Sequence, residues 1–92
     1  MEGKDIVRIR IRGRYYTFRF GRAVPGAVGH YDPDRRELVV SPSLRGEHRL
    51  DTVIHELLHA ALPDLDEDAV NTTASDIARL LWRLGYRDDT SA

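Results

Sequence analysis

The alternation of apolar and charged residues near the start of the chain predicts an antiparallel hairpin. Over residues 5–12, valine or isoleucine at every second position alternates with arginine, which is the two-residue period of a half-buried strand. A turn at Gly13 follows, and aromatic residues at every second position from Tyr16 to Phe20 continue the alternation on a second strand. The arginines would then lie on the outer side of this hairpin.

A second hairpin is predicted after a loop rich in glycine and proline at residues 21–29. Residues 29–31 precede a turn at residues 32–35, and the largely apolar run at residues 37–40 forms the returning strand. Proline at the second turn position and β-branched residues after it favour this arrangement. The sequence Ser-Pro-Ser at residues 41–43 then ends the strand, because proline cannot continue the ladder.

Two longer apolar patterns predict helices. The first, capped at Asp51 or a nearby residue and stopped by Pro63, is apolar almost all round, which is the profile of a buried helix. The second follows a tight link at residues 64–66 and ends near Gly85. Its core-facing stripe has the spacing i, i+3, i+4, i+7 and would consist of Val70, Thr73, Ile77, Leu80 and Leu84, with Ala74 and Leu81 beside it. The opposite face would consist of Asp68, Thr72, Ser75 and Arg79.

These elements predict a single α+β domain in which a small antiparallel sheet, built from the two hairpins, packs on two long helices. The 92 residues suffice for one domain, which we expect to be ordered from residue 5 to 86 and to end in a flexible tail at residues 87–92. No apolar run is long enough to span a membrane, and the polar start does not resemble a signal peptide. We therefore expect a soluble cytoplasmic protein without a membrane partner.

Charge and cysteine content narrow the chemistry. The chain has no cysteine, so disulfides and thiolate metal sites are excluded. Up to Arg49 there are eleven basic and six acidic residues, whereas from Leu50 onward nine acidic residues oppose three arginines. An acidic half of this kind suits a cation. The arginines of the first hairpin could track nucleic-acid phosphates, but such residues also guard an edge hairpin against edge-to-edge pairing, and the sequence favours that role.

The acidic half contains the sequence His55-Glu56-Leu57-Leu58-His59, which is an HExxH pattern. Two histidines four residues apart lie on one face of a helix, at a spacing that lets both imidazoles bind one zinc ion. Glu56 is rotated to the side of that pair, from where it can act as a general base on a metal-bound water without being a ligand. A structural, hydrogen-bonded histidine pair is the alternative, since unpaired buried polar groups are costly.

A catalytic zinc ion usually has three protein ligands, so the motif needs one more. The candidates follow the first helix and are Glu67, Asp64, Asp66 and Asp68. Helical phase favours Glu67, three residues before Val70, because it faces the first helix, whereas Asp68 faces water. Asn71, one turn after Glu67, is placed to orient a ligand histidine. A capping box formed by Asp64 and Glu67 is the alternative use of that glutamate.

Together these residues resemble the zincin metallopeptidases, in particular the small gluzincin-like or SprT-like proteins often encoded by phages and prophages. The resemblance rests on residues 53–60 around the motif, on Glu67 and Asn71, and on the strand at residues 37–40, and it covers roughly residues 29–84. It implies a minimal zincin core in which His55 and His59 bind zinc and Glu56 activates the water. It also implies that the strand before the motif helix is the edge that aligns an extended peptide.

The expected function is therefore zinc-dependent hydrolysis of peptide bonds in an extended peptide or protein, in the host cytoplasm if the protein is phage-associated. The substrate would add as a strand beside residues 38–40 through main-chain hydrogen bonds. Candidate oxyanion partners are His30, Tyr31 and Tyr86. The alternative is a non-catalytic metal-binding module, structural or associated with nucleic acid. The sequence identifies neither the substrate nor the oligomeric state.

Overall fold

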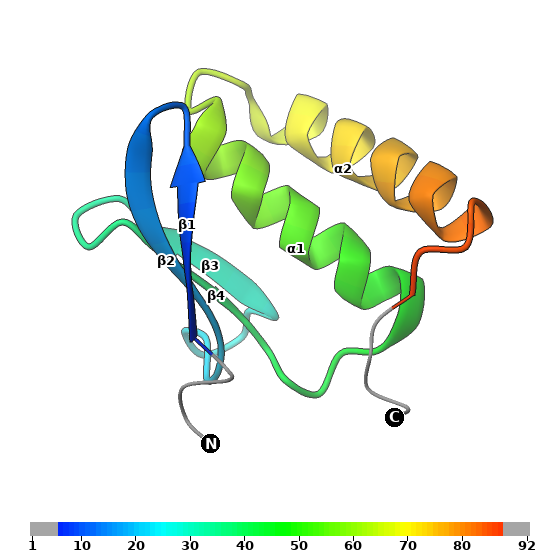
Figure 1. The fold of residues 1–92 in the computed structure, drawn as a ribbon, viewed down its shortest axis with the longest axis horizontal. Helices are drawn as coiled ribbons and strands as arrows, with labels where there is room; N and C mark the ends of the chain where they lie inside the picture. The colour runs from blue at the N-terminus through cyan, green and yellow to red at the C-terminus, as the bar shows by residue number, and fades with distance from the viewer. Residues whose placement is uncertain (1–5, 88–92) are drawn as a thin grey trace.

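The computed structural model describes residues 6–87 and confirms the α+β class (Figure 1). Its elements in chain order are β1 (Ile6–Ile11), β2 (Arg14–Phe20), β3 (Gly29–Asp32), β4 (Glu37–Val40), α1 (Gly46–Ala61) and α2 (Glu67–Arg83). The tail expected at residues 87–92 lies outside the described residues except for Arg87, whose guanidinium carbon is 3.9 Å from the centre of the Trp82 ring. Neither described helix is long and apolar enough to cross a membrane.

Both predicted hairpins are present, each closed by residues suited to its turn. Arg12 and Gly13 have φ values of 50° and 85°, and two consecutive positive values are what a two-residue type I′ turn requires. In the second turn, Asp32 Oδ1 accepts hydrogen bonds from the amides of Asp34 and Arg35 at 3.0 and 3.3 Å.

The way in which the hairpins join corrects the sequence prediction. The strand order is β1-β2-β4-β3, and β2 pairs with β4 in parallel, with Phe18 opposite Leu38. The sheet is therefore mixed and not wholly antiparallel. Because β4 lies between β2 and β3, both of its edges are already paired, so the prediction that a substrate strand adds beside residues 38–40 is wrong. The free edges of the sheet belong to β1 and β3.

Helix α1 lies between the sheet and α2, and so has two buried sides (Figure 1). Ala60 joins the core on the sheet side, which also contains Ile11, Tyr16 and Leu38. Ile54 packs on the α2 side against Ala74 and Ala78. Leu57, in contrast, is 36% exposed, so the apolar surface of α1 is not covered all round.

The start of α1 also differs from the prediction, because the helix begins at Gly46 and not near Asp51. Gly46 has a φ of 67°, a conformation that glycine adopts without steric cost, and a side chain there would start 3.8 Å from the Trp82 ring. Arg45 at the N-cap position provides no side-chain cap. Asp51 lies inside the helix, where its Oδ2 accepts a hydrogen bond from Ser75 Oγ at 2.9 Å. The predicted stop before Pro63 is confirmed.

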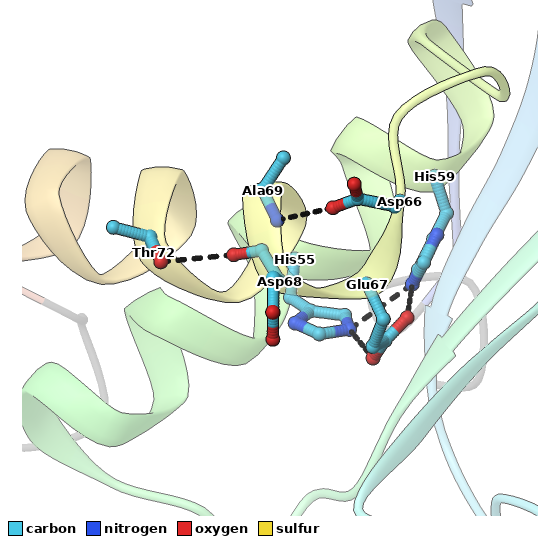
Figure 2. A network of polar contacts seen from close by, with 7 residues as sticks. All are labelled: His55, His59, Asp66, Glu67, Asp68, Ala69 and Thr72. Carbon is cyan, nitrogen blue, oxygen red and sulfur yellow. Dashed lines mark hydrogen bonds and ion pairs between the residues drawn. The ribbon is translucent and has the colours of Figure 1, made fainter.

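Helix α2 is capped by Asp66, whose Oδ1 accepts a hydrogen bond from the Ala69 amide at 2.8 Å (Figure 2). The capping box with Asp64 as the cap is therefore wrong, and Glu67 is the first helical residue. The predicted end near Gly85 is confirmed. Gly85 has a φ of 101°, and the Tyr86 amide donates to the Leu81 carbonyl at 3.0 Å, which is a Schellman-type ending.

The buried side of α2 is narrower than the predicted stripe. Val70, Ala74 and Ala78 are fully buried against α1. The larger residues that the stripe included lie outside it, since Ile77, Leu80 and Leu84 are 37%, 58% and 65% exposed. Small side chains let the two helix backbones approach closely, so alanine occupies the contact. Ser75, expected on the outer face, instead reaches Asp51 on α1.

Candidate metal centre

Three residues from the two helices bring metal-ligating atoms together. His55 and His59, one turn apart on α1, point their rings toward the Glu67 carboxylate at the start of α2 (Figure 2). The two Nε2 atoms are 3.1 Å apart. Glu67 Oε2 is 3.3 Å from His55 Nε2, and Glu67 Oε1 is 3.3 Å from His59 Nε2. Helical phase thus places Glu67 toward the histidines, as the sequence predicted.

The spacing of these atoms suits a tetrahedral metal ion. With zinc–ligand bonds of about 2.0–2.2 Å, neighbouring ligand atoms in a tetrahedral site are about 3.3–3.6 Å apart. The observed distances of 3.1 to 3.3 Å require only a slight expansion. Two imidazoles and a carboxylate can therefore hold a metal ion here, and this ligand set suits zinc as well as other first-row transition metals.

Hydrogen bonds between neutral histidines and the carboxylate satisfy the same side chains less well. A neutral imidazole carries at most one hydrogen on Nε2, and that nitrogen is either a donor or an acceptor. If one neutral histidine donates its Nε2 hydrogen to the other, neither Nε2 has a hydrogen left to donate to the Glu67 oxygen 3.3 Å away. A cation accepts electron density from all three side chains at once, so the geometry favours a metal ion over a cluster of neutral histidines.

The centre is open on one side. The side chains of His55 and His59 are 19% and 29% exposed, whereas that of Glu67 is 64% exposed. A cavity of about 560 Å³ adjoins them, walled by the edge strand β3 and by Pro33 and Pro63. Catalytic zinc sites keep one coordination position for water or substrate, and this arrangement leaves room for it.

Glu56 lines the same cavity but is not one of the three clustered residues. It is only 6% exposed. Burial raises the pKa of its carboxyl group, the positive charge of a protonated His55 lowers it, and the negative charge of Glu67 raises it further. A raised pKa brings a carboxylate closer to the range in which a general base works at neutral pH.

No protein-family model, curated protein or solved structure matches this chain. The likeness to zincins thus rests on the sequence motif.

Gly29, the first residue of β3, lets the edge strand approach Glu56 closely. A Cβ at this position would lie 3.2 Å from Glu56 Oε2, 3.1 Å from the Val39 carbonyl oxygen and 3.0 Å from Thr52 Cγ2. The sequence prediction did not include this residue in the site. Its only signal was a glycine opening a strand, which marks a close backbone approach in general but does not name the neighbour.

Two of the three candidate oxyanion partners, His30 and Tyr31, line the cavity of about 560 Å³ beside the candidate metal centre, which we call the metal cavity. Burial raises the pKa of Tyr31, and the neighbouring Tyr16 raises it further, so the phenol is protonated at neutral pH and can donate a hydrogen bond. His30 Nδ1 is buried without a hydrogen-bond partner. Tyr86 is 61% exposed and lines a separate cavity beside Trp82.

The remaining candidates stand apart from the metal-binding group. Asn71 lines a neighbouring cavity together with His55, but its amide makes no hydrogen bond to either histidine. Asp66 caps α2, and Asp64 and Asp68 are exposed. None of the three aspartates belongs to the cluster of His55, His59 and Glu67, and Figure 2 shows Asp66 and Asp68 beside it.

Proposed function

We propose that this protein is a zinc-dependent metallopeptidase that hydrolyses peptide bonds in an extended peptide or protein. The observation that carries the proposal is the open group formed by His55, His59 and Glu67, whose nitrogen and carboxylate atoms make contacts of 3.1 to 3.3 Å, next to the buried carboxylate of Glu56. A zinc ion held by these three side chains would supply the positive charge that polarises a water molecule and the substrate carbonyl. The proposed general base and the proposed partner for the carbonyl oxygen come from the chain itself.

Glu56 is the proposed general base. Its carboxylate takes a proton from the attacking water and later delivers it to the leaving amine, which restores the starting state. Two features support this role. The raised pKa makes the Glu56 carboxylate a stronger base than an ordinary glutamate, and the side chain borders the cavity without joining the ligand group.

The substrate is proposed to lie along β3 instead of β4. The Ser41 amide donates to the Val28 carbonyl at 2.8 Å, which continues the β3–β4 ladder by one pair. Because hydrogen-bonded pairs alternate along an antiparallel ladder, the main-chain groups of Gly29 and Tyr31 point away from β4. Both residues line the metal cavity, so an extended peptide paired with them would pass the three ligands.

Tyr31 is the proposed partner for the negative charge that develops on the carbonyl oxygen. It lines the cavity and keeps its phenolic proton at neutral pH, as a hydrogen-bond donor must. Its ring centre lies 6.2 Å from that of Tyr16, which holds it at this end of the sheet.

A metal-binding module without turnover is the second candidate. Structural zinc sites are closed by four protein ligands, whereas the group found among residues 6–87 has three and is open on one side. If such a module binds nucleic acid, it would do so through the outer face of the first hairpin. On that face the Arg8 guanidinium lies 4.1 Å from the centre of the Tyr15 ring. Steeply salt-dependent DNA binding without hydrolysis would favour it.

Glu56→Gln tests the proposal directly. The amide keeps the size of the side chain but cannot take a proton, so we expect full zinc content and a loss of kcat/KM of at least about a hundredfold on a labelled unfolded protein. Glu47→Gln, an exposed residue in the first turn of α1, serves as the matched control and should behave as wild type. Hydrolysis by Glu56→Gln at the wild-type rate would refute the proposal.

A further inference from the structure

A second cavity continues the metal cavity along α1 toward the start of that helix. It has a volume of about 490 Å³ and shares Gly29, His55 and Glu56 with the metal cavity. The three shared residues lie beside the metal-binding atoms, so the two cavities are halves of one cleft. A peptide that runs along β3 past the ligands would therefore place a side chain in this second half.

The second cavity carries negative charge without a basic partner. Asp51 is half-buried in its wall, and its Oδ2 accepts a hydrogen bond from Ser75 Oγ at 2.9 Å. No lysine or arginine lines this cavity, and no ion pair of Asp51 exists among the residues that the structure describes. Two histidines also line the wall, the exposed His48 and the candidate metal ligand His55. A cationic side chain entering the cavity would meet a carboxylate that nothing neutralises.

Glu56 supplies an independent sign that this space receives a ligand. Its side chain is 6% exposed, borders both cavities and makes no hydrogen bond to any residue from 6 to 87. Because neither of its oxygens is fully enclosed, the carboxylate faces the cavity space, where a bound group would meet it. Asp51, whose carboxylate accepts a hydrogen bond from Ser75, and Glu56 thus border the same half of the cleft.

The dimensions suit a long side chain. Asp51 precedes His55 by four residues, which is about 6 Å along the helix axis. Ala27, Val28 and the methyl group of Thr52 provide apolar wall along this path. Lysine and arginine combine an aliphatic stem with a charged end, so the stem would lie against that wall while the charge reaches Asp51.

We propose that this second half of the cleft is a specificity subsite in which Asp51 binds a lysine or arginine side chain next to the scissile bond. The proposal rests on the peptidase function proposed above and names its substrate class, namely peptides with a basic residue at one fixed position beside the cleaved bond. Ser75 is the positioning residue, because its hydroxyl holds one oxygen of Asp51 and leaves the other for the substrate.

Matched fluorogenic peptides that differ at one position test this subsite on the zinc-loaded full chain. Each position flanking the cleaved bond is varied among lysine, arginine, norleucine and glutamate, and the products are identified by mass spectrometry. The wild type should cleave lysine and arginine peptides with a kcat/KM about ten- to a hundredfold above that for norleucine, at one position only, and glutamate peptides least well.

Asp51→Asn is the diagnostic variant, because asparagine can accept the same hydrogen bond from Ser75 but has no charge. It should reduce the ratio of lysine to norleucine cleavage to about one. Asp68→Asn, which removes an exposed charge elsewhere on α2, should keep the wild-type ratio. The wild-type profile tests the subsite even if the Asp51 variant folds poorly.

The outcomes separate the two proposals. Equal cleavage of basic, neutral and acidic peptides by the wild type, with Glu56→Gln inactive, would overturn the subsite and leave the peptidase standing. An unchanged lysine preference in Asp51→Asn would also overturn the role of Asp51. Absence of Glu56-dependent cleavage of every peptide would overturn the peptidase function and the subsite with it.

Discussion

Glu56 and Glu67 carry the same side chain in opposite surroundings, and this difference separates their roles. Glu56 is 6% exposed and belongs to no ion pair among the described residues, whereas the Glu67 side chain is 64% exposed and lies 3.3 Å from both histidines. Burial without a partner raises the pKa of Glu56, as proton transfer needs. The exposed carboxylate of Glu67 remains available as a metal ligand.

The burial of Glu56 makes the stability of the metal-free protein depend on pH in a defined direction. Because its pKa is raised in the folded state, the folded protein binds this proton more tightly than the unfolded chain. The resulting stabilisation is complete below the ordinary pKa of glutamate and is lost as pH rises through the folded value. Glu56→Gln cannot undergo this loss, so its melting temperature relative to wild type should rise between pH 4 and pH 7.

Thermal unfolding in the presence of a chelator measures this difference. Glu47→Gln is the control. Because Glu47 is exposed, the melting temperature of this variant should differ from that of wild type by nearly the same amount at both pH values. If the melting temperature of Glu56→Gln relative to wild type stays constant or falls with rising pH, Glu56 is not a carboxylate whose charged form is destabilised by burial.

The motif residues could be predicted from sequence because their relation is local. His55, Glu56 and His59 lie within five positions on one helix, where a fixed periodicity determines which side chains share a face. Gly29 and Asp51 could not be assigned in this way. Gly29 matters because it meets Glu56, and Asp51 because it meets Ser75, 24 residues along the chain. Such contacts depend on how the elements pack.

At the scale of the elements, α2 illustrates both the success and the failure of helical phase. The same periodicity that turned Glu67 toward α1 also predicted a leucine-rich contact, yet the residues fully buried there include Ala74 and Ala78. Hydrophobicity ranks leucine above alanine, whereas close packing of two helices selects for small volume at the crossing. Helical phase therefore predicted the orientation of Glu67 correctly, but it placed the apolar contact of α2 on the wrong set of residues.

Substitutions on α2 can test this packing. Ala78→Leu inserts a large side chain into the α1–α2 contact and should lower the free energy of unfolding by about 1–3 kcal/mol. Leu80→Ala, on a side chain that is 58% exposed, should change it by less than about 0.5 kcal/mol. Urea unfolding monitored through Trp82 gives both values. A larger loss for Leu80→Ala than for Ala78→Leu would contradict the observed phase of α2.

The sequence of β4 indicated its central position in the sheet, but the prediction from alternating residues did not use this feature. Leu38, Val39 and Val40 are all fully buried, and a run without alternation is typical of a central strand covered on both faces. The two hairpins were predictable because each is closed by a short turn. The parallel pairing of β2 with β4 was not, because it joins strands separated by a long loop and by β3. That pairing is what moves the proposed substrate edge to β3.

At the scale of the whole molecule, the candidate metal centre ties together parts of a small domain. Its two histidines lie in the second half of α1, and Glu67 opens α2, which packs mainly on α1 (Figure 1). A metal ion bound to all three would cross-link the helices and stabilise the folded state by mass action. The acidic half of the chain, seen first as a charge asymmetry, supplies the Glu67 ligand and the Asp51 wall of the cleft.

The most direct test of the account is a zinc titration of wild type, Glu67→Ala and Asp68→Ala. Calorimetry measures the zinc affinity, and X-ray absorption identifies the atoms bound to zinc. The wild type should bind one zinc ion through two histidine nitrogens, with oxygen atoms as the remaining ligands of the zinc ion. Glu67→Ala should bind it more weakly by on the order of a hundredfold, since one of three protein ligands is lost, while Asp68→Ala should match wild type. Equal affinity in the two variants, or no zinc bound by the wild type, would contradict the metal centre and the function proposed from it.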